Sequence, residues 1–298
     1  MKSMKLAKKL VTDTRKSSTF AEKKMRILVL PDIHGRDFWR EPCKNIDKFD
    51  KVIFLGDYLD PYGFENISVE SAIGNFKDIL KFAKDNPKVV MLLGNHDMAY
   101  FSQTYYGFSS WHCRHSEMHH KDISALFKEH EDMFKIADVE DNILFTHAGC
   151  VSGWLNNTFG NDYFKEYNLP KLCDDINELL KTDYGLLQLY QVSRERGGDA
   201  FYGSCIWADY SEMRYDVDAY SDNMHPIRDV KQIFGHTMQA YGKQKVVDNG
   251  SGKLKVIYEY NFAENPLEYN NIKMLDNACA YELDTKEFKI QKIRNEKN

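Results

Sequence analysis

Three short polar motifs, each at the end of an apolar run, contain the residue types that bind catalytic metal ions. PDIHG supplies Asp32 and His34, GDYLD supplies Asp57, and GNHD supplies Asn95. Carboxylate, amide and imidazole ligands suit Mn²⁺, iron or Zn²⁺, whereas an all-oxygen cage would suit Ca²⁺. One such motif alone is weak evidence. Because three occur in order, each after an apolar run, we interpret them as parts of one metal-centred site.

Two histidines farther along the chain, His147 in THAG and His236 in FGHT, enlarge this set of ligands. The full set is then large enough for two ions that share one carboxylate. In a two-metal site with ions about 3.5 to 4 Å apart, a bridging hydroxide attacks phosphorus in line while both ions neutralise the phosphoryl oxygens. Asp57 belongs to the middle of the three motifs, so we expect it to be the shared ligand.

The same motifs offer a proton donor for the leaving group. His96 is adjacent to Asn95 and is therefore expected at the edge of the site, where it can act as general acid. Asp60 follows Asp57 by three residues, and a nearby carboxylate raises the pKa of an imidazole. We expect Asp60 to keep His96 protonated.

The elements that must position these residues follow from the hydrophobic pattern. Apolar runs bounded by turn residues predict strands at 26–30, 52–55, 89–93, 143–146 and 232–234, and later at 254–262, 272–275, 280–283 and 288–290. An apolar stripe from Val69 to Ala83 predicts a helix, with Ser68 as N-cap and Pro87 beyond its end. Strand, helix and strand in this order are typical of α/β proteins, whose ligands bind beyond the carboxyl ends of the strands.

The domain organisation predicted from the pattern is simple. Residues 1–24 are rich in Lys, Ser and Thr and are expected to be a basic, flexible leader. A targeting function is the alternative, although Asp13 and Glu22 count against it. Residues 25–298 are expected to form one domain, with an elaboration at about 151–231 in which a helix is predicted at 171–180.

Composition limits the classes of function. The chain of 298 residues is 43% hydrophobic and 29% charged, as expected for a globular protein with a sizeable core. A formal net charge of −5 argues against a general nucleic-acid binder. Six cysteines without a C-x-x-C pair indicate neither a zinc knuckle nor a disulfide framework. The scattered cysteines favour a reducing compartment and the N-terminus lacks the apolar core of a secretory signal, so we expect a cytoplasmic protein. Because no stretch reaches the roughly 18 apolar residues of a membrane span, we expect no membrane partner.

The motifs PDIHG, GDYLD, GNHD, THAG and FGHT, in this order, resemble those of the calcineurin-like metallophosphoesterases. The resemblance is greatest to the serine/threonine protein phosphatase branch and its bacterial and phage relatives, including symmetrical diadenosine tetraphosphatases. SCIWADY at 204–210 and MLDNACAY at 274–281 are similar to later segments of that branch, so the resemblance covers about residues 26 to 290. It implies an α/β, four-layer αββα fold, with two packed mixed β-sheets flanked by helices.

The resemblance also implies how the ligands are divided between two transition-metal ions, with Mn²⁺ ranked first and iron or zinc as alternatives. The first ion would take Asp32, His34 and Asp57, and the second would take Asp57, Asn95, His147 and His236. His96 and Asp60 would form the acid pair.

One departure from the family pattern bears on the substrate. In the protein phosphatases an arginine that clamps phosphate follows the second Asp of the GDxxD motif, but here Pro61 stands in its place. Because a guanidinium group is a strong phosphate ligand, either another arginine substitutes or the affinity for phosphoprotein is low. Arg194 and Arg196 are the first candidates, followed by Arg114.

The function we expect is hydrolysis of phosphate monoesters, with a phosphorylated small molecule or a phosphoprotein as the partner. A dinucleoside polyphosphate hydrolase is the first alternative, and a phosphodiesterase or nuclease is compatible with the same ions. A non-catalytic scaffold should have lost a ligand or the acid, and this chain has lost neither. The sequence leaves the oligomeric state open.

Two further groups of residues have alternative interpretations. His112, His115 and His119 share a predicted helical face and could bind an extra ion, although surface histidines are more common. Aromatic residues of the elaboration could line a substrate groove, but most such residues are packing residues; they are Trp154, Tyr184, Tyr202, Trp207 and Tyr210.

Overall fold

The computed structural model describes residues 24–103, 113–160, 163, 168–218, 227, 230–248 and 254–293. The predicted leader therefore lies outside the described residues except for Lys24, and so does His112. The predicted domain boundaries remain a prediction.

The first sheet contains the strands that end in the three N-terminal motifs. Its order is β13-β12-β1-β2-β3-β4. The first four strands in the chain are parallel, namely β1 (Arg26–Leu30), β2 (Lys51–Phe54), β3 (Val89–Leu92) and β4 (Phe134–Lys135). The C-terminal strands β12 (Tyr281–Asp284) and β13 (Lys289–Lys292) add antiparallel pairs at one edge, so this sheet is mixed.

The second sheet contains the strands that end at the two distant histidines. Its order is β10-β11-β7-β6-β5. The parallel strands are β11 (Ile272–Met274), β7 (Lys231–Phe234) and β6 (Ile143–Thr146), and antiparallel pairs bring in β10 (Leu267–Tyr269) and β5 (Ala137–Glu140). This sheet is therefore also mixed.

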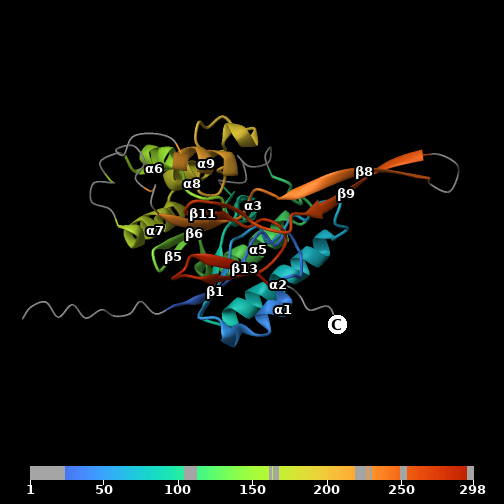
Figure 1. Ribbon diagram of the computed structural model, residues 1–298, viewed down its shortest axis with the longest axis horizontal. Helices are drawn as coiled ribbons and strands as arrows, with labels where there is room; N and C mark the ends of the chain where they lie inside the picture. Colours follow the sequence, from blue (N-terminus) through green and yellow to red (C-terminus); the bar gives the residue numbers. More distant parts are fainter. Residues whose placement is uncertain are drawn as a thin grey trace, which may run out of the picture.

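Alternate residues of each strand face different layers, because successive side chains of a strand point to opposite faces. Ile27 and Val29 of β1 form a buried cluster with Ile143 and Phe145 of β6, which lies between the two sheets. The intervening residue Leu28 belongs to a second buried cluster that includes the flanking helices. The two packed mixed sheets, flanked by helices, confirm the predicted fold class (Figure 1).

Helix α2 (Val69–Asp85) covers the outer face of the first sheet as its sequence predicts. The Ser68 hydroxyl accepts a hydrogen bond from the Ser71 N–H at 3.1 Å, which satisfies one of the unpaired donors of the first turn. The helix ends before Pro87, which cannot continue it. On the same side of the molecule lie α1 (Arg40–Cys43) and α5 (His120–Glu129), and α3 (Asn95–Phe101) contacts α5.

The segment between β6 and β7 is helical in its described part. It contains α6 (Ser152–Phe159), α7 (Leu169–Glu178), α8 (Asp183–Leu189) and α9 (Tyr210–Asp218). Elsewhere and within this segment, the described residues also form short 3₁₀ helices at Ile46–Lys48, Glu131–Met133, Leu179–Lys181 and Arg194–Arg196. Helix α7 packs against β5, where the Asn177 side chain accepts the N–H groups of Ile136 and Ala137. None of the helices in these described ranges has the length and apolar composition that a membrane span requires.

Four strands were not expected from the sequence. β4 and β10 are too short for a hydrophobic pattern, and β5 places Asp138 and Glu140 in ion pairs with Lys51 of the other sheet. The fourth is β8 (Ala240–Asp248), which pairs with the predicted β9 (Leu254–Phe262) in a two-stranded ribbon that extends away from the sheets (Figure 1). β4 and β10 are short, and β5 and β8 carry charged residues, so none of the four has the long apolar run by which the other strands were predicted.

Candidate metal centre

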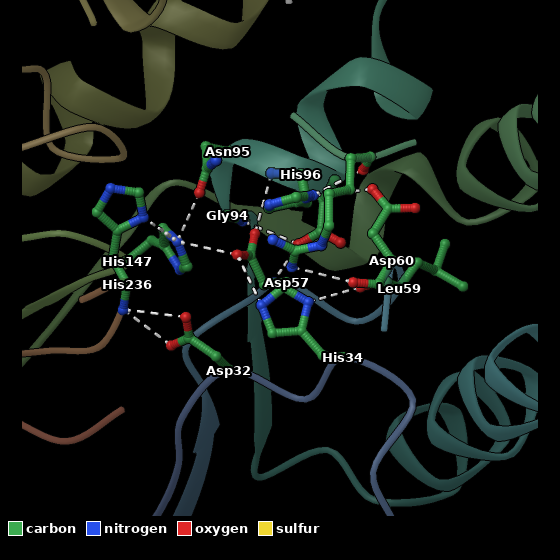
Figure 2. A network of polar contacts seen from close by, with 12 residues as sticks. Asp32, His34, Asp57, Leu59, Asp60, Gly94, Asn95, His96, His147 and His236 are labelled. Atoms are coloured by element: carbon green, nitrogen blue, oxygen red, sulfur yellow. Dashed lines mark hydrogen bonds and ion pairs between the residues drawn. The ribbon is translucent and has the colours of Figure 1, made fainter. Parts of the chain in front are cut away.

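The predicted ligands lie in turns at the carboxyl ends of strands from both sheets. Asp32 follows β1, Asp57 follows β2 and Asn95 begins α3 just after β3. His147 and His236 follow β6 and β7 of the second sheet in the same way. Figure 2 shows Asp57 in the middle, with His147 and His236 on one side and His34 on the other. The two sheets thus contribute to one rim.

The structure brings all six predicted ligands together. Asp32, His34 and Asp57 form one group in which a ligand atom of each residue lies within 4.8 Å of the others. Asp57, His147 and His236 form a second group by the same measure. The amide oxygen of Asn95 lies 3.0 Å from His147 Nε2, beside the second group. Asp57 is the member common to both groups, as expected for a shared carboxylate.

Several of these residues adopt a left-handed backbone conformation that only glycine adopts without strain. The φ angles are +45° at His34, +54° at Asp57, +59° at Asp60 and +69° at His236. Such conformations cost about 1–3 kcal/mol each and persist where the surroundings impose them. Here the turn of β1 is bonded to the turn of β2, since the His34 N–H donates to the Asp57 carbonyl at 2.7 Å. The strain is concentrated at the rim where the ligands meet.

Two glycines allow the turns to approach the carboxylates. A Cβ on Gly94 would lie 2.1 Å from Asp57 Oδ1, and a Cβ on Gly235 would lie 2.0 Å from Asp32 Oδ1. Because these glycines have no side chain, the backbone can approach both carboxylates. The His236 N–H donates to Asp32 Oδ1 at 2.9 Å, and the His96 N–H donates to Asp57 Oδ1 at 3.0 Å. The backbone therefore holds one oxygen of Asp57 and leaves Oδ2 to face the histidines.

The orientation of the histidine rings tests whether cations fit this site. The carbonyls of Leu59 and Leu55 lie 2.8 Å from the Nδ1 atoms of His34 and His147. A carbonyl only accepts hydrogen bonds, so Nδ1 carries the proton and Nε2 of the neutral ring presents a lone pair. Each Nε2 lies 3.4 Å from Asp57 Oδ2.

The lone pairs on the Nε2 atoms of His34 and His147 face the negatively charged Asp57 Oδ2, and a cation between these atoms would stabilise the arrangement. Burial holds the pKa of His34 well below its usual value, despite the opposing effect of Asp57, so the ring is neutral near pH 7. The same cause lowers the pKa of His236, whose Nδ1 lies 3.1 Å from His147 Nε2. Neutral imidazoles oriented by backbone carbonyls are the usual form of metal-binding histidine. The donor set therefore fits metal ions.

The predicted acid pair is also assembled. His96 Nδ1 lies 2.9 Å from Asp60 Oδ2 and 2.9 Å from the Arg114 carbonyl, so both acceptors fix the proton on this nitrogen. Tyr100 donates its hydroxyl to the other oxygen of Asp60 at 2.6 Å. Burial works to lower the pKa of His96, but the charges of Asp57 and Asp60 outweigh it, and the pKa is raised.

Comparison with known proteins agrees with this geometry. The family model of calcineurin-like phosphoesterases matches residues 25–240. The chain belongs to the calcineurin-like phosphoesterase family. No curated protein matches the chain. Members of this family are generally dimetal-dependent phosphoester hydrolases, and the donor set of this chain fits that requirement.

Two solved structures are similar in fold to this calcineurin-like phosphoesterase. One is a metallophosphoesterase from Sphaerobacter thermophilus, at 10% identity and a TM-score of 0.43, with 92% of this chain and 90% of that chain covered. The other is a protein provisionally described as a diadenosine tetraphosphatase, at 11% identity and a TM-score of 0.42, with 90% and 93% covered. Neither likeness bears on the substrate.

One buried residue of the phosphoesterase site was not assigned a role from the sequence. The carboxylate of Asp97 accepts N–H groups from Asp57 at 2.6 Å, Tyr58 at 2.9 Å and Gly94 at 2.9 Å. It therefore joins the turn after β2 to the start of α3. A local signal exists for this contact, since an acidic residue at the third position of a helix commonly accepts the N–H of the capping residue.

The two arginines proposed first as phosphate ligands differ in position. Arg196 donates to Thr237 Oγ1 at 2.6 Å and to the His236 carbonyl at 3.3 Å, so it lies against the FGHT turn. Its Nε also pairs with Asp209 at 3.0 Å. Arg194 is exposed and lies 5.5 Å from the Phe201 ring, and within the described part of the chain it contacts none of the predicted ligands. Of these two arginines, the one that the structure brings to the rim is therefore Arg196.

The other residues singled out in the sequence are the histidines of the 112–119 segment and the aromatic residues of the elaboration. Within the described ranges, neither His115 nor His119 belongs to a group of three metal-binding side chains, and His119 bonds to Ser116. Trp154 is buried in the core, with its indole N–H donated to the Gln188 carbonyl. Trp207 is buried edge-on against His236 at 5.8 Å, whereas Tyr184 is exposed. A substrate groove along these aromatic residues stays a prediction.

Proposed function

We propose that this member of the calcineurin-like phosphoesterase family hydrolyses phosphate monoesters with two bound transition-metal ions. The observation that carries the proposal is the position of Asp57 Oδ2, which lies 3.4 Å from the Nε2 atoms of both His34 and His147. Acceptors oriented in this way from two sides favour a cation on each side of a shared carboxylate. Mn²⁺ ranks first, with iron and zinc as alternatives.

The residues would be divided between two positions. Asp32, His34 and Asp57 would hold one ion, and Asp57, Asn95, His147 and His236 would hold the other. Bound ions would activate a water molecule and neutralise the negative charge of the phosphoryl oxygens. Because the ligands come from both sheets, the position of each ion depends on the packing of the whole core.

His96 would protonate the leaving oxygen. Its Nδ1 is occupied by Asp60 and the Arg114 carbonyl, so the proton that can be transferred is the one on Nε2. The raised pKa keeps the ring protonated to higher pH than usual, which suits a general acid. Tyr100 orients Asp60 from behind. Proton transfer of this kind contributes about 10² to 10⁴ in rate.

Monoesters rank first among substrates, and phosphoproteins are included in that class. Dinucleoside polyphosphates are the main alternative, because the same metal-binding residues would serve both. Phosphodiester hydrolysis on nucleic acid ranks lower, since a net charge of −5 opposes binding of a polyanion away from the metal ions.

The direct test is hydrolysis of p-nitrophenyl phosphate by protein stripped with a chelator and reloaded with Mn²⁺, Fe²⁺, Zn²⁺ or Mg²⁺. We expect activity to return with a transition metal. Asp57→Asn and His96→Ala should lower kcat by about 100-fold or more. Asp78→Asn is a matched control, because Asp78 is exposed and pairs with Arg40 on the surface. Full activity in Asp57→Asn would contradict the proposed mechanism.

The substrate class is tested with the same metal-loaded protein. Turnover of phosphoserine and phosphotyrosine peptides, diadenosine tetraphosphate and bis-p-nitrophenyl phosphate would be compared at equal concentrations. The proposal expects the monoesters to be hydrolysed with the highest kcat/KM. A higher kcat/KM for diadenosine tetraphosphate would make the dinucleotide class the better assignment, and rapid cleavage of the diester would favour a phosphodiesterase.

A further inference from the structure

The GDYLD turn leaves one requirement of phosphoester chemistry unmet. The residue after Asp60 is Pro61, which has neither a charge nor a side-chain donor. A phosphate monoester has non-bridging oxygens that metal ligands alone do not fix in orientation, and a guanidinium group suits them because it offers parallel N–H donors. A guanidinium from elsewhere in the chain can supply this contact only if it reaches the same point.

Arg114 does so from a segment 54 residues farther along the chain. Its Nη2 donates to the Asp60 carbonyl at 3.2 Å. Its guanidinium carbon lies 3.8 Å from the centre of the Tyr62 ring. The guanidinium therefore contacts the chain immediately before and immediately after Pro61, where the turn itself has no positive charge.

The backbone around Arg114 is joined to the acid pair. The Arg114 carbonyl accepts from His96 Nδ1 at 2.9 Å, and the Ser116 N–H donates to the Tyr100 hydroxyl at 2.7 Å. Cys113 Sγ lies 3.5 Å from the Asn95 carbonyl. These contacts fix the segment against α3 and so fix the point from which the Arg114 side chain starts.

The N–H donors of Arg114 are less occupied than those of its neighbours. The guanidinium carbon lies over the Tyr62 ring, and a contact of this kind with a ring face does not use the N–H donors. Within the part of the chain that the structure describes, its Nη2 bond to Asp60 is the one hydrogen bond that the side chain makes, and no carboxylate pairs with it.

Among the residues that the structure describes, two other arginines near the rim are already paired. Arg36 donates from Nε and Nη2 to Glu65 and from Nη1 to the Asp32 carbonyl. Arg196 is paired with Asp209. The positive charge of Arg114 is close enough to interact with two histidines of the site, because its repulsion acts to lower the pKa of both His34 and His96.

Resting on the proposed function, we infer that Arg114 binds the non-bridging oxygens of the phosphoryl group and so takes the place of the arginine that is missing at position 61. The ligand class is a phosphate monoester dianion, or inorganic phosphate as product. Tyr62 acts as the platform that holds the guanidinium flat, and Asp60 directs one of its N–H groups away from the ligand.

The test is the affinity of the Mn²⁺-loaded protein for inorganic phosphate, measured by calorimetry. Arg114→Gln should raise the dissociation constant by about 10- to 100-fold, the effect of losing a charged hydrogen-bond donor. Arg114→Lys should fall between Gln and wild type, because an ammonium keeps the charge but not the parallel donors. Arg40→Gln is the matched control, since Arg40 also lies against an aromatic ring, Trp39, but is paired with Asp78. An Arg114→Gln value within twofold of wild type would overturn the inference, as would a wild-type protein that binds no phosphate.

A second comparison separates binding by Arg114 from an indirect effect through His96. The same calorimetry is repeated with Arg114→Gln in a His96→Asn background. If Arg114 contacts phosphate, the loss of affinity persists when His96 is absent, and if the loss disappears, the inference is wrong. Calorimetry also distinguishes the two proposals. A wild-type protein that binds phosphate through Arg114 but hydrolyses no ester would contradict the proposed function alone.

Discussion

The metal-binding turns and the arginines beside them are held in place by different means. The turns after β1, β2 and β7 are fixed by backbone hydrogen bonds and by glycines that admit no side chain, and their ligands adopt strained left-handed conformations. Arg114 and Arg196 instead reach the rim through long side chains that lie on a ring or pair with a carboxylate. Under the proposed function, the metal-binding part of the site is built into the fold, whereas the group that contacts phosphate is supplied by another segment.

The largest effect is expected from filling the space beside the carboxylates. Gly94→Ala and Gly235→Ala each place a methyl about 2 Å from a ligand oxygen, so we expect loss of bound metal and a fall in activity of about 100-fold. Metal content by mass spectrometry and kcat for p-nitrophenyl phosphate would be measured together.

Gly74→Ala is the control for this prediction. Gly74 lies in α2 with no atom within 4 Å of an added Cβ, so the change should stabilise the helix by about 0.5–1 kcal/mol and leave metal binding intact. If Gly94→Ala and Gly235→Ala kept their full metal content, the metal-binding turns would not be fixed by close packing. The proposed difference between these turns and the arginines beside them would then be wrong.

The acid pair should show the next largest effect, through pH dependence. The Asp60 charge helps to raise the pKa of His96, so Asp60→Asn should lower that pKa. Activity that needs protonated His96 falls as the pH rises through its pKa, and the alkaline fall of the kcat profile should therefore move to lower pH. We also expect kcat to drop by about 10- to 100-fold. An unchanged alkaline limb would show that His96 does not act as the acid.

Tyr100 should have a smaller effect on the same step. Tyr100→Phe removes the hydroxyl that donates to Asp60 and accepts from the Ser116 N–H. Loss of such a bond costs about 1 kcal/mol, or roughly fivefold in kcat, with KM little changed. A fall as large as that of Asp60→Asn would mean that Tyr100 supports more than the orientation of one carboxylate.

The smallest effect is expected for the arginines named first from the sequence. Arg196→Gln removes contacts with Thr237 and the His236 carbonyl and should raise KM by roughly two- to fivefold. Arg194→Gln should raise KM less than Arg196→Gln does, because Arg194 is exposed. The opposite order in steady-state assays on p-nitrophenyl phosphate would show that the elaboration approaches the site in another way.

The features of the fold and the site that could be predicted are those with a pattern in the local sequence. Asp32, Asp57 and His147 could be placed together because each follows an apolar run and the carboxyl ends of strands meet at one edge of a sheet. Helix α2 and its N-cap Ser68 were predicted because the apolar spacing and the capping residue are both local signals.

The parts that were missed depend on distant neighbours. β5 is polar, and its buried Asp138 pairs with Lys51 of the other sheet and with Lys135. Likewise nothing near Arg114 in sequence indicates its place beside Asp60 and Tyr62, since Asp60 lies 54 residues earlier in the chain.

The central claim is that Asp57 joins two metal positions in one phosphoesterase site. It is tested most directly by counting the metal ions bound per chain in wild-type protein and in Asp57→Asn, alongside hydrolysis of p-nitrophenyl phosphate by the same samples. We predict two ions per wild-type chain, fewer in the variant, and loss of at least about 100-fold in kcat. Two ions and full activity in Asp57→Asn, or a wild-type enzyme that stays active after complete removal of metal, would contradict the claim.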